Sequence, residues 1–204
     1  MLENNDRKKI EDYINKLLNA IYSDIRKDMD NGKGSREVID SAINLTVNKL
    51  TPESKMILSS AYNMMMEKTL AKTAYQNAQN KAAFYSKDIL KQLNSKFSFD
   101  VPNHIDYEET RKLLNKWIAS GAIVVAGGVI SIPAKSFTPI AIATVIAGIM
   151  LFLLKGQAVK TESDIEHVIK DYLKNVKDSL MAWMKEIENF YDEEVAKLEK
   201  ELDK

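Results

Sequence analysis

The sequence predicts an all-α protein in which long amphipathic helices form a bundle or stalk and carry a two-helix apolar transmembrane hairpin. Three observations support this prediction. Apolar residues recur at helical spacing through most of the 204 residues. Glycine and proline are scarce, at seven and four residues, so few positions interrupt a helix. The stretch from Trp117 to Leu154 is almost free of charge.

The pattern divides the chain into four parts. Residues 1–50 are predicted to form an N-terminal helical pair, and residues 51–116 a long helix followed by a lead-in helix. Residues 117–155 are predicted to form the hydrophobic transmembrane hairpin, and residues 156–204 the long C-terminal amphipathic helix. The first ten residues lack an apolar core, so no secretory signal peptide is expected.

Turn and capping signals bound the N-terminal helices. Apolar residues three and four apart predict a helix over residues 5–29 and a second one over residues 35–50. Thr51 and Pro52 then predict a new helix, because threonine caps a helix and proline fits its first turn. This third helix is predicted to extend to about residue 96.

The last helix is predicted near residues 162–202, where apolar residues keep near-heptad spacing. A narrow face of small residues lies on the preceding long helix and consists of Ala71, Ala74, Ala78 and Ala82. We expect the last helix to pack antiparallel on that face, because small residues leave room for large ones such as Trp183 and Phe190.

The apolar hairpin contains two segments of nearly membrane-spanning length. Residues 117–134 are 18 uncharged residues and residues 136–154 are 19, with Lys135 as the one charge between them. About 20 apolar residues cross a hydrocarbon core as a helix. The β-branched run at residues 123–125 is typical of a strand, but the length of the segment favours a helix. A spanning helix also satisfies its own backbone hydrogen bonds, which an open pair of strands does not.

Small residues four apart predict close helix packing within the hairpin. The residues expected to take part in insertion are Trp117, Gly121, Ala122, Val125, Ala126, Gly127, Gly128, Lys135, Ala143, Ile146, Ala147 and Gly148. Two alternatives stay open at this point. The hairpin is either two buried helices of a soluble protein, or it is hidden in a soluble form and released on contact with a membrane.

Basic residues near the hairpin predict its orientation. Five lie in its flanks, against Lys135 alone in its turn, and these five are Arg111, Lys112, Lys116, Lys155 and Lys160. The positive-inside rule then places both termini in the cytoplasm. Localisation is therefore expected to be the membrane, with the hidden soluble form as the alternative.

Catalytic and metal-binding signatures are missing from the sequence. Cysteine is absent, so disulfides and thiolate chemistry are excluded. His104 and His167 lack partners at metal-ligand spacing, and Lys170 stands where an HExxH motif would need histidine. A formal net charge of zero argues against a nucleic-acid partner. We therefore expect no enzyme activity, no cofactor and no metal.

Two segments of the hairpin, IASGAIVVAGGVISIP and TPIAIATVIAGIMLFLL, resemble the hydrophobic hairpin of pore-forming colicins. That resemblance implies a soluble helical bundle that inserts its hairpin and depolarises a membrane. The chain departs from colicins in the charged amphipathic helix that follows the hairpin. A second resemblance is to α-helical pore formers of the cytolysin A type, in which an apolar head also lies between long helices.

Two functions are compatible with this pattern. In the first, the protein permeabilises a membrane as an oligomeric α-helical pore, as a toxin or cell-killing effector does, with the lipid bilayer and further copies of the chain as its partners. In the second, the hairpin is only an anchor, and the cytoplasmic helices are a scaffold that binds a protein partner. The small-residue faces slightly favour the pore, because they promote helix assembly.

Overall fold

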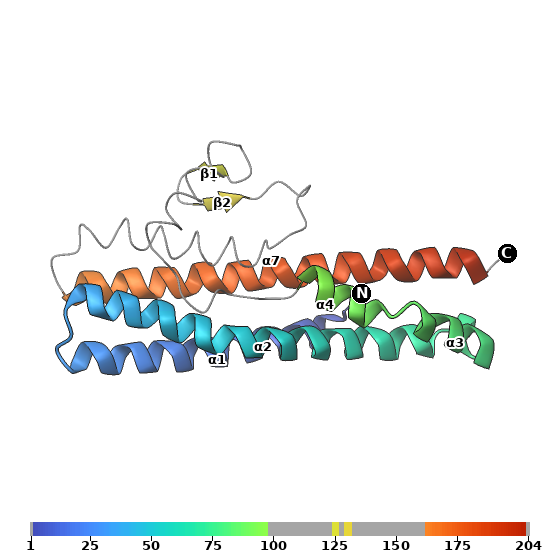
Figure 1. Cartoon of the computed structure of the whole chain (residues 1–204), viewed down its shortest axis with the longest axis horizontal. Coiled ribbons are helices and arrows are strands. Elements are labelled where there is room, and N and C mark those ends of the chain that lie inside the picture. The colour runs from blue at the N-terminus through green and yellow to red at the C-terminus, as the bar shows by residue number, and fades with distance from the viewer. Residues whose placement is uncertain (1, 98–123, 127–128, 132–161, 203–204) are drawn as a thin grey trace.

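The computed structural model describes residues 2–97, 124–126, 129–131 and 162–202, and these residues are predominantly α-helical (Figure 1). The elements are α1 (Asn4–Asp30), α2 (Ser35–Ala71), a short 3-10 helix η1 (Thr73–Tyr75), α3 (Ala78–Ser86), α4 (Ile89–Phe97), β1 (Val124–Ala126), β2 (Val129–Ser131) and α7 (Glu162–Leu202). The sequence-based prediction of an all-helical bundle is confirmed for most of this part of the chain.

Helix α1 forms where the apolar spacing predicts it. Its buried face carries Ile10, Ile14, Leu18, Ile21 and Ile25, which are three or four residues apart and therefore lie on one side of the helix. The helix ends at Asp30, and Gly32 follows with a φ of 73°. Glycine adopts this left-handed conformation without steric cost, so the chain turns there into α2.

The predicted break at Pro52 is wrong, because α2 continues through it. The apolar stripe of this helix keeps helical spacing on both sides of the proline, with buried residues Val47, Leu50, Ser54, Ile57, Leu58, Ala61 and Met65. The Thr51 hydroxyl donates to the Val47 carbonyl at 2.9 Å and reinforces the turn that lacks the proline N–H. Burial of a continuous stripe thus outweighs the local cost of the proline.

The predicted long helix over residues 52–96 is also wrong, because the chain leaves helical geometry twice after α2. Lys72 is extended, and Asn77 caps α3 by accepting a hydrogen bond from the Asn80 backbone N–H at 2.7 Å. Between α3 and α4, Asp88 has a φ of 46°, which aspartate tolerates better than most residues. The region is therefore a series of short elements that fold back along α2 (Figure 1).

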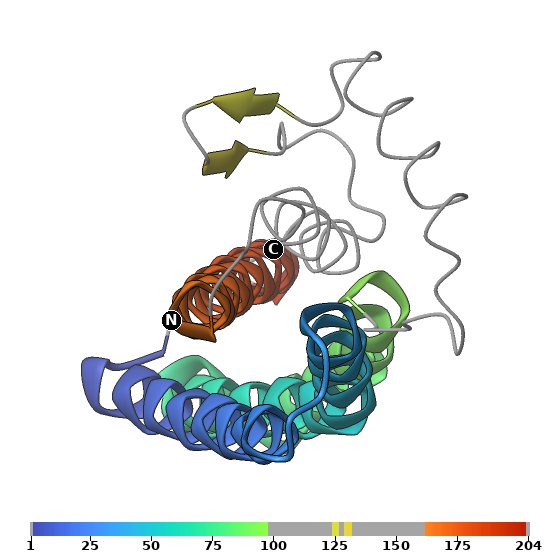
Figure 2. The same cartoon turned by 90° about the vertical axis from the view of Figure 1, so that its left-hand side faces the viewer.

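Helix α7 matches the predicted range and extends along the whole bundle (Figure 1), and the end-on view in Figure 2 shows it beside the layer of the other helices. The sequence predicts that this helix runs antiparallel to the whole of residues 52–96, and the structure confirms this for only part of that range. It is parallel to α2, since Lys72 pairs with Glu199 and Tyr62 packs on Tyr191. It is antiparallel to α1, and also to the α3–α4 segment, where Lys87 pairs with Glu201 and Phe97 packs on Phe190.

The prediction that α7 packs on a face of four alanines is wrong. Ala71, Ala74, Ala78 and Ala82 are all exposed. Trp183 and Phe190 are buried, as expected, but they lie in the core that α7 shares with the other helices. The reason is the end of α2 at Ala71, which breaks the helical register that would have aligned the four alanines on one face.

Two short strands replace helix within the first predicted membrane crossing. Val124–Ala126 pairs antiparallel with Val129–Ser131, and Val125 lies opposite Ile130. A continuous helix over residues 117–134 is therefore wrong for this structure. Valine and isoleucine favour extended backbone, and the two glycines between the strands in the sequence are typical of a tight hairpin.

Within the described residues, no helix combines the length and the apolar character that crossing a bilayer requires. Most of the predicted hairpin lies outside those residues, so its transmembrane helices stay a prediction. The lead-in helix before Trp117 lies outside them as well.

Tyr75 gives a first testable prediction, because its buried hydroxyl has no hydrogen-bond partner among the described residues. Tyr75→Phe removes this unsatisfied group, and we expect the free energy of unfolding to rise by about 1 kcal/mol in urea titrations. The matched control is Tyr191→Phe. Its hydroxyl donates to the Thr69 hydroxyl at 2.8 Å, so its removal should lower stability by about 1 kcal/mol. Equal effects of the two substitutions on stability would contradict the assignment of the Tyr75 hydroxyl as unsatisfied and of the Tyr191 hydroxyl as bonded.

Candidate functional site

One turn of α7, at residues 188–191, contacts three other helices. Glu188 binds the start of α1, Phe190 packs against the end of α4, and Tyr191 bonds to α2. We call Glu188, Phe190 and Tyr191 the α7 junction. It includes the point where the start of the chain reaches α7, since the Leu2 backbone N–H donates to Glu188.

Glu188 is the charged centre of the α7 junction, and its side chain is only 3% exposed. Its carboxylate accepts hydrogen bonds from the Leu2 backbone N–H at 3.1 Å and from Arg7 Nε and Nη2 at 3.1 and 2.7 Å. Lys185 Nζ lies 3.6 Å away on the same helix. Two cations and one backbone donor thus compensate a carboxylate that is almost completely removed from water.

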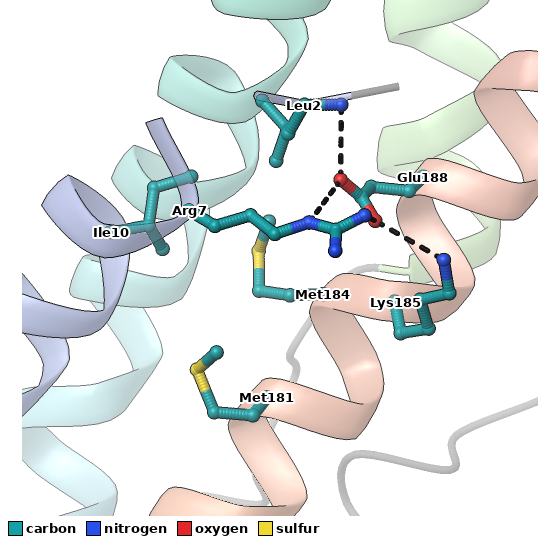
Figure 3. Close-up of a pocket in the computed structure, with 7 residues that line it drawn as sticks. All are labelled: Leu2, Arg7, Ile10, Met181, Met184, Lys185 and Glu188. Atoms are coloured by element: carbon teal, nitrogen blue, oxygen red, sulfur yellow. Dashed lines mark hydrogen bonds and ion pairs between the residues drawn. The ribbon is translucent and has the colours of Figure 1, made fainter. Parts of the chain in front are cut away.

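A small pocket of about 120 Å³ lies beside this carboxylate (Figure 3). Its walls come from the start of α1 and from one stretch of α7, and its lining residues are Leu2, Arg7, Ile10, Met181, Met184, Lys185 and Glu188. Figure 3 shows the Arg7 side chain extending across the pocket to Glu188. The two methionines have flexible side chains that adapt to small changes in their neighbours.

Further ion pairs hold the first turn of α1 in place. Asp6 is buried and pairs with Lys68 of α2 and with Lys9 of its own helix. The hydrogen bond from Lys68, together with that from Lys9, holds the pKa of the Asp6 carboxyl below its usual value. Asp6 therefore stays ionised at neutral pH and binds α1 to α2 close to the α7 junction.

Phe190 and Tyr191 complete the α7 junction with aromatic contacts. The rings of Phe190 and Phe97 are 5.8 Å apart, and Lys96 Nζ lies 4.1 Å from the centroid of the Phe190 ring. The ring of Tyr191 packs edge-on against Tyr62 at 6.0 Å. Burial raises the pKa of the Tyr191 hydroxyl above its usual value.

The sequence-predicted insertion residues are only partly placed by the structure. Val125 and Ala126 lie in β1. The remaining ones lie outside the described residues, and these are Trp117, Gly121, Ala122, Gly127, Gly128, Lys135, Ala143, Ile146, Ala147 and Gly148. Of the packing residues, Trp183 and Phe190 lie in or near the α7 junction, and the four alanines do not.

Sequence reasoning missed Glu188, although a signal for it exists. The residue is four positions after Met184 and three before Tyr191, so it occupies the apolar stripe of α7. A carboxylate on such a stripe needs a cationic partner, and Arg7 supplies it from the other end of the chain.

The described residues offer little for metal or acid–base chemistry. They contain no group of three or more His, Cys, Asp or Glu side chains that could hold a metal ion. His167 is exposed and lies 3.7 Å from Asp171, which fits the expected surface position, whereas His104 lies outside the described residues. The α7 junction holds helices together, but its described residues present no nucleophile beside a base.

Comparison with known proteins found no matching family model, no matching curated protein and no matching solved structure.

Proposed function

We propose that this protein permeabilises membranes, with its helical bundle delivering the apolar segment 117–154 to a bilayer and further copies of the chain assembling the inserted segments into a helical pore. The observation that carries the proposal is the position of this segment. It lies in the chain between α4 and α7, two helices that pack on each other through Phe97 and Phe190.

The surface of the bundle supports delivery from a water-exposed form. Among the described residues, the large apolar side chains that are exposed are Tyr13, Met56 and Tyr85, and they come from different parts of the helices. Scattered residues of this kind do not form a broad apolar face. A bundle with this surface fits a water-exposed form in which the apolar segment is hidden before insertion. It fits less well a protein whose apolar segment is always in lipid.

Insertion requires the strand pair to change. The two strands Val124–Ala126 and Val129–Ser131 form a two-stranded sheet, whose outer edges leave backbone groups without strand partners. Hydrocarbon offers these groups no hydrogen bonds, so a spanning segment must be helical or part of a closed barrel. The proposal therefore includes a strand-to-helix conversion of residues 124–131 in the bilayer.

The second candidate function is a membrane-anchored scaffold without pore activity. The mixed ion pairs on α1 and α7 give it some support, because charged helical surfaces also suit protein partners. The two functions differ in one measurement. A pore releases dye from vesicles, whereas an anchor binds the same vesicles and leaves them sealed.

Charge placed in the apolar segment gives the sharpest test of insertion. An arginine at the centre of a spanning helix costs roughly 2.5–3.5 kcal/mol. Because 1.4 kcal/mol corresponds to a factor of ten, Val125→Arg or Ile146→Arg should reduce dye release from vesicles on the order of 100-fold. Circular dichroism should show that the helices of the bundle are retained. The control is Ala82→Arg, which adds the same charge at an exposed position of α3.

Two outcomes would contradict the proposal. Unchanged dye release in both apolar-segment variants would show that this segment does not enter lipid. Binding of the unaltered chain to vesicles without any release of dye would favour the scaffold instead.

A further inference from the structure

The N-terminal turn of the chain is clamped on α7 by a contact between two ends of the sequence. Leu2 and Arg7 bind Glu188 through three hydrogen bonds, across more than 180 residues of sequence. Hydrogen bonds to charged groups are stronger than neutral ones, and this one is bidentate. The contact therefore joins the start of α1 to an interior turn of α7.

The contact with Glu188 lies close to the contact that α7 makes with the last residue of α4. Glu188 and Phe190 are two residues apart on α7, and Phe190 packs against Phe97, the last residue of α4. A displacement of α7 at Glu188 is therefore transmitted to the contact that fixes the end of α4. Residues 98–123 follow in the sequence and lead into the apolar segment.

The geometry of this contact also favours its opening. The Arg7 side chain is 41% exposed, although its partner Glu188 is only 3% exposed, so water reaches the arginine without unfolding of the core. A pocket of about 120 Å³ lies beside it and is lined by side chains from the start of the chain and from α7, so the packing between these two parts is interrupted there. When Arg7 leaves, Lys185 stays within 3.6 Å of Glu188 and continues to compensate the buried carboxylate.

We propose that the Leu2–Arg7–Glu188 contact is an autoinhibitory latch, which must open before the apolar segment enters a bilayer. This inference rests on the proposed membrane insertion and adds its regulation. In the closed state the latch holds α1, α7 and the end of α4 together. In the open state, α7 and α4 separate near Phe97, and the apolar segment becomes free to enter a bilayer.

Charge substitution tests the latch in the full-length chain. Arg7→Glu places two carboxylates together and should speed the initial release of dye from vesicles about tenfold or more, because a charge-assisted bidentate contact is lost. Arg7→Glu combined with Glu188→Arg restores an ion pair and should return the rate to within about threefold of the unaltered chain. The milder Arg7→Gln serves if Arg7→Glu loses its helical circular dichroism.

A second ion pair between the same helices provides the matched control. Lys177 of α7 pairs with Glu11 of α1 at 2.7 Å, and it lies further from the end of α4. Lys177→Glu disrupts an α1–α7 pair of the same length but does not touch the latch. We expect it to leave the rate of dye release within about twofold, in the range of surface pairs.

Spin labelling separates the latch from the proposed function. The chain has no cysteine, so cysteines introduced at the exposed positions Asn5 of α1 and Ala182 of α7 are the sole labelling sites. In the absence of lipid, the distance between the two labels should lengthen or broaden in Arg7→Gln and stay unchanged in Lys177→Glu. This readout needs no pore, so the latch is tested even if the unaltered chain fails to release dye.

Two results would overturn the latch. Equal rates of dye release in Arg7→Gln, Lys177→Glu and the unaltered chain would show that the contact does not limit insertion. An unchanged distance between the labels in Arg7→Gln would show that Arg7 does not hold α1 on α7. Loss of dye release in every chain, with the distance change retained, would refute the pore and leave the latch as a contact that opens.

Discussion

Trp183→Ala should lower the free energy of unfolding by about 3–5 kcal/mol, one of the two largest effects that we expect in this protein. Trp183 lies on α7 with only 3% of its surface exposed, in the core that α7 shares with the other helices of the bundle. Removal of the indole loses its transfer free energy and leaves a cavity that the surrounding helices fill only in part.

Urea titrations across a range of protein concentrations measure this effect and its origin. Because Trp183 is buried within a single chain, we expect the loss of stability to be independent of concentration. Asn189→Ala is the control, since Asn189 is exposed on the same helix and should change stability by less than about 0.5 kcal/mol. A loss that grows on dilution would instead place Trp183 in a seam between copies of the chain.

The helices with the clearest apolar stripes were predictable from the sequence. The expected ranges 5–29 and 162–202 agree closely with Asn4–Asp30 and Glu162–Leu202 in the structure. Both helices have a strong three-and-four pattern, and their ends coincide with turn residues or with the end of the pattern. Periodicity thus sufficed where a single helix face is buried along its whole length.

Local signals failed where tertiary packing decides the structure. Pro52 predicts a helix start, but the stripe of α2 continues in register, so its burial keeps one helix of 37 residues. The four alanines have helical spacing in the sequence, but the chain leaves the helix between the first and the second of them, so the face never forms. A spacing argument holds only if the helix is continuous, and nothing in the alanines themselves guarantees it.

The sequence contains different kinds of evidence for the strand pair and for the α7 junction. For the first strand, the β-branched run at residues 123–125 is typical of a strand, whereas the length of the uncharged segment favours a helix. For the α7 junction, Glu188 was visible as a charge on an apolar stripe. Its partner Arg7 lies 181 residues away, and a contact at that separation follows from the direction of α1 along α7 rather than from any local pattern.

The other large effect should appear at alkaline pH, because the bundle buries tyrosine hydroxyls in their neutral form. Burial, together with the negative charge of Glu199, raises the pKa of Tyr75 to about 12. Burial also raises the pKa values of Tyr172 and Tyr191 of α7. These three side chains connect α7 or η1 to the core, so their ionisation acts on the contacts that close the bundle.

The sign of the effect follows from proton linkage. Tyrosines of the unfolded chain ionise near pH 10, whereas Tyr75 in the folded chain holds its proton up to about pH 12. The contribution of such a group is complete below about pH 10 and is lost as the pH rises through its folded value. For Tyr75, a difference of about two pKa units corresponds to a loss of roughly 2–3 kcal/mol, and Tyr172 and Tyr191 add losses of the same sign.

We therefore expect the free energy of unfolding, measured in urea at pH values from about 8 to 12, to fall steeply above pH 10. Deprotonation of lysines such as Lys27, whose pKa is raised by its hydrogen bond with Asp24, contributes in the same direction. Tyr75→Phe distinguishes the two sources, because it removes the hydroxyl and leaves every lysine in place. Its stability should decline less with pH than that of the unaltered chain, whereas identical slopes would assign the alkaline loss to lysines. Ionisation of all eight tyrosines near pH 10, in a chain that keeps its full helical circular dichroism, would contradict the buried, neutral hydroxyls of Tyr75, Tyr172 and Tyr191.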